Sequence, residues 1–361
     1  MYNILTLNKI AKCGLAQLGE DYAITDNEAV NADGIILRSY NMHDMELGSN
    51  LKAVARAGAG TNNIPIDKCT EKGIVVFNTP GANANAVKEA VIAGLILSSR
   101  DIIGGVEWAK TLTGDDVTKQ VEKGKSNFAG SEIKGKTLGV IGLGAIGILV
   151  ANAAYTLGMD VIGYDPYLSV DAALKLSRHV KKVNDPKEIY ENADYITIHI
   201  PYSEATKDTI NAENIATMKD GVKILNFARN GLVNNDAVKQ ALDSGKVSCY
   251  VVDFPNEETI GYKGIIAIPH LGASTEESEE NCAVMASRQI ADYLENGNIT
   301  NSVNFPNCSL AMSGIGRVAI IHQNVKKVIG QFTDALSDVN ICDMVSKSKN
   351  DVCLLYTSRC V

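Results

Sequence analysis

Short apolar runs separated by polar stretches recur along the first hundred residues, at the length of strands that alternate with helices. A longer stretch, residues 83–102, carries Ala, Val, Ile and Leu on nearly every face, which predicts a buried helix. The expected strands are residues 2–7, 33–39, 51–60 and 73–80. The first part of the chain therefore predicts a small α/β domain.

A cleaner alternation begins at Thr137, after a more polar segment, residues 103–135. Six apolar runs of strand length follow, and helical stretches lie between most of them. The expected strands are residues 137–141, 160–165, 194–200, 222–228, 248–254 and 265–270. This alternation predicts a parallel sheet with both faces covered by helices. A last helix, about residues 275–295, is expected to cross back toward the N-terminal domain.

The composition is that of a globular protein, and it narrows the classes of partner. The chain has 361 residues, enough for two domains at roughly 150 residues each. Apolar residues make up 45% and charged residues 21%, and the net charge is −8. Because an acidic chain is unsuited to a nucleic-acid or anionic membrane surface, we expect neither partner. An anionic substrate must then be held by local positive groups.

The eight cysteines are scattered, and none forms a CxxC pair or a Cys/His cluster with zinc spacing. We therefore expect no metal site and free thiols in a reducing cytoplasm, since the N-terminus also lacks the pattern of a signal peptide. Residues 138–159 carry no charge and are long enough to cross a bilayer, but five glycines interrupt them. A strand, a turn and a helix explain this segment better than a membrane span.

A dinucleotide-binding pattern follows the first strand of the central alternation. Gly142, Gly144 and Gly147 form G-x-G-x-x-G between an expected strand and an expected helix. The glycines permit a tight turn, close approach of a pyrophosphate and close packing of helix on strand. Asp165 ends the next expected strand, where an acid would bind the ribose hydroxyls. No arginine lies in "DPYLSV" to receive a 2′-phosphate, so NAD is favoured over NADP; a structural glycine turn with a surface aspartate is the alternative.

Chemically versatile residues stand at the carboxyl ends of the later strands, the edge at which open α/β sheets bind ligands. Arg229 follows "ILNFA", Glu257 and Glu258 follow "SCYVVDF", and His270 follows "GIIAIP". Histidine suits proton transfer to or from a hydroxyl group, and a carboxylate partner fixes its tautomer. A guanidinium binds a carboxylate through two parallel hydrogen bonds. The alternative interpretation of Arg229 is a solvated loop residue. The alternative interpretation of the histidine is a buried core residue whose hydrogen bonds are satisfied.

The chain resembles the D-2-hydroxyacid dehydrogenase family over about residues 1–306. The motifs that carry the resemblance are "RAGAGTNNI", "FNTPGANANAVKEAV", "GVIGLGAIG", "HIPYSEAT", "NFARNGLV", "VDFPNEE" and "IPHLGASTEESEENCA". The resemblance implies that Arg229 anchors the substrate carboxylate and that His270 is the acid/base. The family spacing after the arginine selects Glu258 as the histidine's partner, and a one-residue gap would select Glu257. Asn230 stands where the family has glycine.

The resemblance also implies two sets of binding residues. Cofactor contacts are expected at Gly142, Gly144, Ala145, Ile146, Gly147, Asp165, His199, Pro201, Thr206, Ala228, Asp253 and Gly272. Substrate contacts are expected at Arg38, Ser39, Gly58, Ala59 and Asn63, together with Arg229 and His270. Many members that act on a phosphorylated acid carry a further basic residue after the Arg-Ser pair, and this chain has Tyr40.

The implied fold is α/β, with a Rossmann-type doubly wound parallel sheet for the cofactor and a second, flavodoxin-like α/β domain for the substrate. The substrate domain is expected at residues 1–97 and 283–306, and the NAD-binding domain at residues 98–282. Residues 310–361 resemble the start of an ACT domain, a module that binds small amino acids, often serine. Because only part of the βαββαβ set is present, we expect no serine feedback and a mobile end over the last ~15 residues.

The resemblance favours NAD-dependent oxidation of 3-phospho-D-glycerate, leading to L-serine, in a cytoplasmic homodimer or higher homo-oligomer. One alternative is another acid of the same family, such as hydroxypyruvate, glyoxylate or D-lactate. The other is a non-catalytic NAD-sensing protein that binds a partner, because fold alone does not determine function.

Overall fold

The computed structural model describes residues 1–27, 31–311, 316–349 and 352–359. It divides into two compact units, Met1–Asn83 with Thr275–Val361, and Ala84–Ser274. The division falls before the long apolar helix and before the returning helix. The unit boundaries therefore lie 14 and 8 residues before those expected from the sequence, at 97/98 and 282/283.

The first unit is built on a five-stranded parallel sheet of order β2-β1-β3-β4-β5. The strands are β1 (Tyr2–Leu7), β2 (Tyr22–Thr25), β3 (Gly34–Leu37), β4 (Ala53–Arg56) and β5 (Val75–Phe77). Helices α1 (Lys12–Leu15), α2 (Ile66–Glu71) and α11 (Glu276–Asn296) accompany it. The strand order is that of flavodoxin-like folds, as expected.

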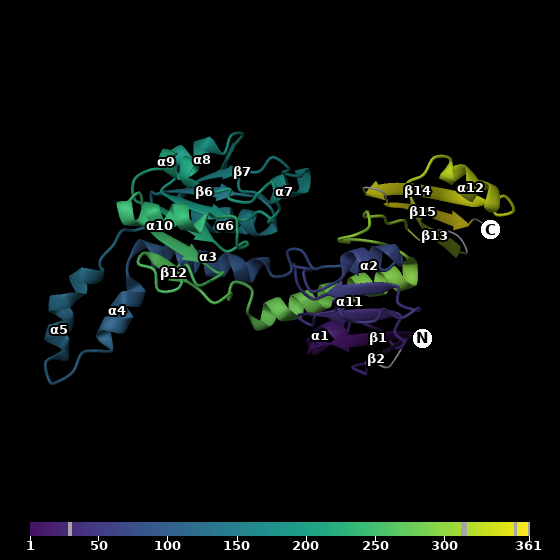
Figure 1. Ribbon diagram of the computed structural model, residues 1–361, viewed down its shortest axis with the longest axis horizontal. Helices are drawn as coiled ribbons and strands as arrows, with labels where there is room; N and C mark the ends of the chain where they lie inside the picture. Colours follow the sequence, from purple (N-terminus) through teal and green to yellow (C-terminus); the bar gives the residue numbers. More distant parts are fainter. Residues whose placement is uncertain (28–30, 312–315, 350–351, 360–361) are drawn as a thin grey trace. The chain divides into compact units, whose positions relative to one another are not determined.

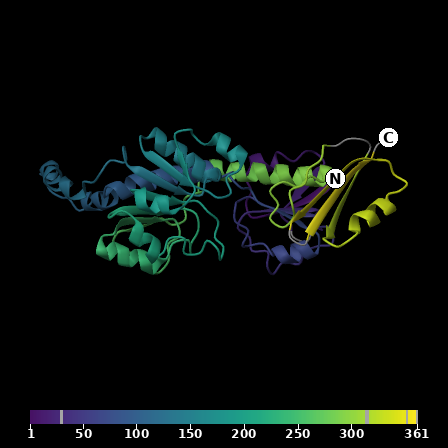
Figure 2. The same cartoon turned by 90° about the horizontal axis from the view of Figure 1, so that it is seen from above.

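The returning helix α11 joins the sheet of the first unit, as the sequence indicates. Cys282, Ala283, Ala286 and Ile290 lie in one core cluster with Ile4 of β1, and all are buried. Figures 1 and 2 show α11, in light green, running along this sheet. The residues before and after the second unit thus share one hydrophobic core.

The second unit contains a seven-stranded parallel sheet of order β12-β11-β10-β9-β6-β7-β8. Its strands are β6 (Thr137–Ile141), β7 (Asp160–Tyr164), β8 (Lys181–Val183), β9 (Tyr195–Ile198), β10 (Val222–Asn226), β11 (Val247–Val252) and β12 (Ile265–Ala267). The order reverses between β6 and β9, so this is the topological switch point at which doubly wound sheets bind ligands.

Helices cover both faces of this sheet. On one face α3 (Ala84–Ser99) and α6 (Ala145–Thr156) contribute Val91, Leu95 and Val150 to a buried cluster. On the other, α8 (Lys187–Asn192), α9 (Ala212–Thr217) and α10 (Asn235–Ser244) contribute Ile189 and Val238. Strands buried on both faces explain why their sequences are continuously apolar.

The polar segment before β6 forms two further helices, α4 (Ile102–Ala109) and α5 (Val117–Gly124), with a 3₁₀ turn (Lys125–Phe128). Figure 1 shows α4 and α5, in blue, projecting from the second unit. Trp108 of α4 packs on Phe128 of the 3₁₀ turn with ring centroids 5.2 Å apart, which holds this turn against α4. The second unit also includes α7 (Val170–Lys175).

The described residues of the C-terminal segment form part of the implied βαββαβ set. Strands β13 (Gly316–Gln323), β14 (Ile341–Lys349) and β15 (Val352–Arg359) form an antiparallel sheet of order β13-β15-β14, with helix α12 (Val328–Ala335) beside it (Figure 2). The expectation of an unanchored end is wrong for residues 352–359, because β15 is the central strand and pairs on both edges. Leu354 is fully buried in the core cluster of the first unit.

The expectation of free thiols is wrong for Cys342. Cys342 is disulfide-bonded, whereas Cys13, Cys69, Cys249, Cys282 and Cys308 are free. Burial raises the pKa of Cys69 and of Cys249 to about 11, so both stay protonated at neutral pH.

Candidate active site

The glycine turn after β6 lies at the topological switch point of the second unit. Gly142 has φ 94°, and a Cβ there would meet the carbonyl oxygen of His199 after β9. A Cβ at Gly147 would overlap the Gly142 carbonyl, whereas Gly144 faces open space. No side chain caps helix α6 at Gly144, so its first N–H groups, at Ala145 and Ile146, are available to a phosphate.

Asp165 follows β7 and closes the turn from the adjacent strand. Asp165 Oδ2 accepts a hydrogen bond from the Leu143 N–H at 2.9 Å, and Oδ1 accepts one from the Tyr167 N–H at 2.8 Å. Each carboxylate oxygen has further lone pairs for a ribose hydroxyl. The aspartate can therefore hold the glycine turn and a ribose at the same time.

We expect Asp165→Ala to weaken NAD binding by about 1–3 kcal/mol, because a ribose loses its acceptor and the turn loses a support. NADP should lose less affinity than NAD, because the variant also removes repulsion of the 2′-phosphate. Isothermal calorimetry with both nucleotides measures this. Asp185→Ala is the matched control, since Asp185 Oδ1 likewise accepts the N–H two residues on, at 2.9 Å. Equal NAD affinity in the two variants would contradict the assignment.

The loop after β9 contains the predicted cofactor residues His199, Pro201 and Thr206. His199 Nε2 lies 2.9 Å from Thr197 Oγ1, while its Nδ1 is buried without a hydrogen-bond partner among the described residues. Burial lowers the pKa of His199 to about 3, so the ring is neutral. Thr206 Oγ1 donates to the Pro201 carbonyl at 2.7 Å and closes the loop. An unpaired imidazole nitrogen beside the glycine turn fits a site for a polar ligand.

Arg229 lies in the loop after β10, and its side chain is exposed. Its Nη1 donates to the Ala228 carbonyl at 2.7 Å, so the guanidinium folds back on its own loop. The loop itself is held by Asn226, a buried residue that sequence reasoning did not single out. The Asn-x-x-Arg spacing in "NFAR" was the signal that could have indicated it.

Glu258 and His270 follow the next two strands, β11 and β12. Glu258 Oε2 accepts from Asn235 Nδ2 at 2.8 Å. The described structure contains no hydrogen bond between His270 and Glu257 or Glu258, so the acid/base pair stays a prediction. Catalytic hydrogen bonds often form only when substrate binds.

The turn that carries His270 is held by Asp253 at the end of β11. His270 adopts φ 54°, a left-handed conformation that a non-glycine residue keeps only when its surroundings impose it. Asp253, 1% exposed, accepts the N–H groups of Leu271 at 2.7 Å and Gly272 at 2.9 Å. Burial raises the pKa of Asp253. The Phe254 ring lies against the imidazole, with centroids 4.7 Å apart.

The predicted substrate residues of the first unit gather around the ends of β3 and β4. Arg38 Nη1 forms an ion pair with Glu279 of α11 at 2.6 Å. The Arg38 carbonyl accepts from Arg56 Nε at 3.0 Å and from Asn63 Nδ2 at 3.2 Å. The Ser39 N–H donates to Asn8 Oδ1 at 2.9 Å. These bonds fix the Arg-Ser pair.

Two charged residues that contact this group were not among the site residues predicted from the sequence. Arg56 lies two residues before Gly58, and its Nη1 donates to the Gly60 carbonyl at 2.5 Å. Glu279 lies far along the chain, so only the fold brings it to Arg38. Arg56 opens the motif "RAGAGTNNI", which was the available signal.

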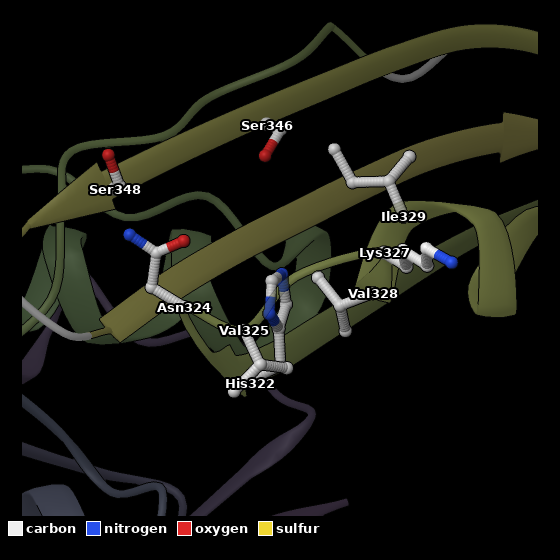
Figure 3. A pocket seen from close by; sticks show the side chains of 8 residues that line it. All are labelled: His322, Asn324, Val325, Lys327, Val328, Ile329, Ser346 and Ser348. Atoms are coloured by element: carbon white, nitrogen blue, oxygen red, sulfur yellow. The ribbon is translucent and has the colours of Figure 1, made fainter.

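A pocket of about 440 Å³ lies in the C-terminal segment (Figure 3). His322 Nε2 is buried there without a hydrogen-bond partner among the described residues, and Nδ1 lies 2.8 Å from the Gln323 carbonyl oxygen. The lining residues are His322, Asn324, Val325, Lys327, Val328, Ile329, Ser346 and Ser348. The pocket offers imidazole, amide, ammonium and hydroxyl groups to a small polar ligand.

In the described part of the chain, no group of three or more His, Cys, Asp or Glu residues could hold a metal ion. No described helix is both long and apolar enough to cross a bilayer.

Comparison with known proteins places these features in a family. Residues 107–272 match the model of the D-isomer specific 2-hydroxyacid dehydrogenase NAD binding domain. The D-3-phosphoglycerate dehydrogenase of Methanocaldococcus jannaschii is 35% identical over 289 residues, which cover 77% of this chain and 52% of that protein. The chain thus spans about half the length of this relative. The putative D-3-phosphoglycerate dehydrogenase of Schizosaccharomyces pombe is 30% identical over 368 residues, 94% of this chain and 75% of that protein.

A solved structure shows the same architecture. The NAD⁺-bound 3-phosphoglycerate dehydrogenase of Entamoeba histolytica aligns with a TM-score of 0.64 at 26% identity, over 84% of this chain and 98% of that one. The glycine turn, the doubly wound sheet and the sequence matches agree with one another. The chain belongs to the D-isomer-specific 2-hydroxyacid dehydrogenase family.

Proposed function

We propose that the chain catalyses the NAD-dependent oxidation of 3-phospho-D-glycerate to 3-phosphohydroxypyruvate, the first step of L-serine biosynthesis. One observation carries the proposal: Arg229, Glu258 and His270 follow three neighbouring parallel strands, β10, β11 and β12, at the sheet edge that bears the glycine turn. The direct test is NAD reduction by 3-phospho-D-glycerate, with D-lactate as the comparison substrate.

Each of these residues has a role that its chemistry supports. Arg229 binds the carboxylate of the substrate through two parallel hydrogen bonds and polarises the neighbouring carbonyl. His270 removes the hydroxyl proton in oxidation and returns it in reduction. Glu258 stabilises the protonated imidazole as it forms.

The residues around the switch point suit the cofactor. The chemistry that NAD supplies when bound is acceptance of the hydride from carbon 2 of the substrate. The uncapped start of α6 at Gly144 receives the pyrophosphate, and Asp165 receives the ribose hydroxyls. His199 Nδ1 and the buried Asp253 offer polar groups to the rest of the dinucleotide.

The substrate's phosphate group is assigned to Arg38 and Ser39. The Arg38–Glu279 ion pair favours a second candidate within the family, an unphosphorylated 2-hydroxy acid, because a phosphate must compete with this carboxylate. Both side chains are partly exposed, at 41% and 46%, so the pair is of modest strength.

We expect Glu279→Gln to raise kcat/KM for 3-phosphohydroxypyruvate about two- to fivefold and to leave hydroxypyruvate and glyoxylate unchanged. The expected gain equals the ~0.5–1 kcal/mol of a partly exposed ion pair. Arg38→Ala should abolish most of the preference for the phosphorylated acid. Initial-rate kinetics measure both, and Glu280→Gln on the same helix is the control. Equal changes for all substrates would assign Arg38 to the fold or to the shared carboxylate.

For the C-terminal segment we propose an incomplete ACT-like module without serine feedback. In its described residues the segment has one helix and three strands, whereas the complete βαββαβ module has two helices and four strands. Initial rates should therefore be equal with and without millimolar L-serine. Inhibition that disappears in Asn324→Ala would show that the pocket of Figure 3 binds the amino acid and would overturn this expectation.

The proposal includes assembly as a homodimer or higher homo-oligomer in the cytoplasm. Exposed apolar side chains on α4 support self-association: Ile102, Ile103 and Val106 are 40%, 44% and 50% exposed.

A further inference from the structure

The loop that carries Arg229 is tied to the end of β10 by one side chain, that of Asn226. Asn226 Nδ2 donates to the Arg229 carbonyl at 2.8 Å. Its Oδ1 accepts the N–H of Ala228 at 3.1 Å and, more weakly, that of Arg229 at 3.4 Å. The amide thus bonds the N–H groups of Ala228 and Arg229 and the Arg229 carbonyl.

Burial makes this amide hard to replace. Asn226 is only 1% exposed, so water has little access to the groups that the side chain satisfies. A shorter side chain would leave partly buried backbone donors and an acceptor without partners. The Asn226 carbonyl also accepts the Asp253 N–H at 3.0 Å, which joins this residue to the strand end that holds the His270 turn.

We propose that Asn226 is a positioning residue for Arg229: it sets the direction from which the guanidinium reaches the substrate carboxylate. The inference rests on the proposed function. Among the residues that the structure describes, the guanidinium bonds only the Ala228 carbonyl of its own loop, so its position follows the backbone that Asn226 holds. A displacement of about 1 Å in a group that orients substrate can reduce the rate about a hundredfold.

Asn226→Ser is the variant that tests this, and Asn152→Ser is its matched control. Asn152 makes the same pair of bonds in the same unit, donating to the Lys175 carbonyl at 2.9 Å and accepting the Ser177 N–H at 2.8 Å. We expect Asn226→Ser to raise KM for the 2-oxo acid at least tenfold and to lower kcat/KM about a hundredfold. The Kd for NADH should stay within twofold, and Asn226→Ser should lose more thermal stability than Asn152→Ser, because Asn226 is the more deeply buried of the two.

A second variant separates positioning from folding. In Asn226→Asp the introduced carboxylate still accepts the two N–H groups but donates to the Arg229 carbonyl only when protonated. Its KM, relative to the wild type, should therefore recover as the pH falls. An unchanged KM in Asn226→Ser, or parallel losses of NADH and 2-oxo acid binding, would overturn the proposal.

If the wild-type chain reduces no 2-oxo acid, the proposed function is contradicted, but the role of Asn226 in holding the loop can still be tested. Amide hydrogen exchange then decides whether Asn226 holds the loop. Faster exchange at Ala228 and Arg229 in Asn226→Ser, but not in Asn152→Ser, would support that role, and equal exchange in the two variants would refute it.

Discussion

Replacing His270 should reduce kcat by roughly 10²–10⁴-fold, the usual contribution of a positioned acid/base. His270→Ala removes the imidazole but also places alanine at φ 54°, where it is strained. His270→Asn is therefore the better variant, because asparagine tolerates the left-handed region and cannot exchange the proton. Both variants should bind NADH as the wild type does, in a fluorescence titration.

The same experiment extends to the two glutamates. Glu258→Gln should shift the pH profile of kcat toward lower pH, because a negative partner favours the protonated imidazole. Glu257→Gln should leave the profile in place. The reverse result would assign the partner role to Glu257, and two unshifted profiles would mean that Glu258 serves only Asn235, to which it is bonded here. Near wild-type kcat in His270→Asn would remove histidine from the chemistry altogether.

Arg229→Lys should be damaging although it keeps the positive charge. An ammonium cannot form two parallel hydrogen bonds to a carboxylate, so we expect a loss of about 1.5–3 kcal/mol in kcat/KM. Steady-state kinetics with a 2-oxo acid measure the change, and Arg178→Lys, at an exposed position of the same unit, is the control. Activity close to wild type in Arg229→Lys would return Arg229 to the class of solvated loop residues.

The sequence predicts the elements around the motifs well, because strands buried on both faces are apolar without interruption. The expected strand 137–141 coincides with β6, and the expected helix at about 275–295 is α11. In the two parallel sheets the strands that the sequence did not predict, β2 and β8, lie at the edges. β8 contains Lys181 and Lys182, and charged residues are common on edge strands because they oppose further pairing.

The parts of the site that escaped prediction depend on contacts between distant residues. The approach of Glu279 to Arg38 joins positions that the sequence separates by most of the chain. The hydrogen bond from the Leu271 N–H to Asp253 likewise depends on the pairing of β11 with β12, which brings the two strand ends together. The motifs supply the chemical groups, but packing decides which of them lie together.

The C-terminal end shows the same limit. The sequence carries only part of the βαββαβ set, and it therefore predicts a mobile end. Strand β15 forms backbone hydrogen bonds with β13 on one side and with β14 on the other, and its Leu354 is buried in the core. These contacts anchor the end of the chain over residues 352–359. Pairing between strands is a non-local property that short sequence motifs do not report.

The most direct test of the proposed function is NADH oxidation by the full chain with a panel of 2-oxo acids: 3-phosphohydroxypyruvate, hydroxypyruvate, glyoxylate and pyruvate. We expect 3-phosphohydroxypyruvate to give the highest kcat/KM, and the preference to fall in Arg38→Ala. A higher kcat/KM for an unphosphorylated acid would contradict the proposed substrate, and no turnover of any of the four would contradict the proposed catalytic function.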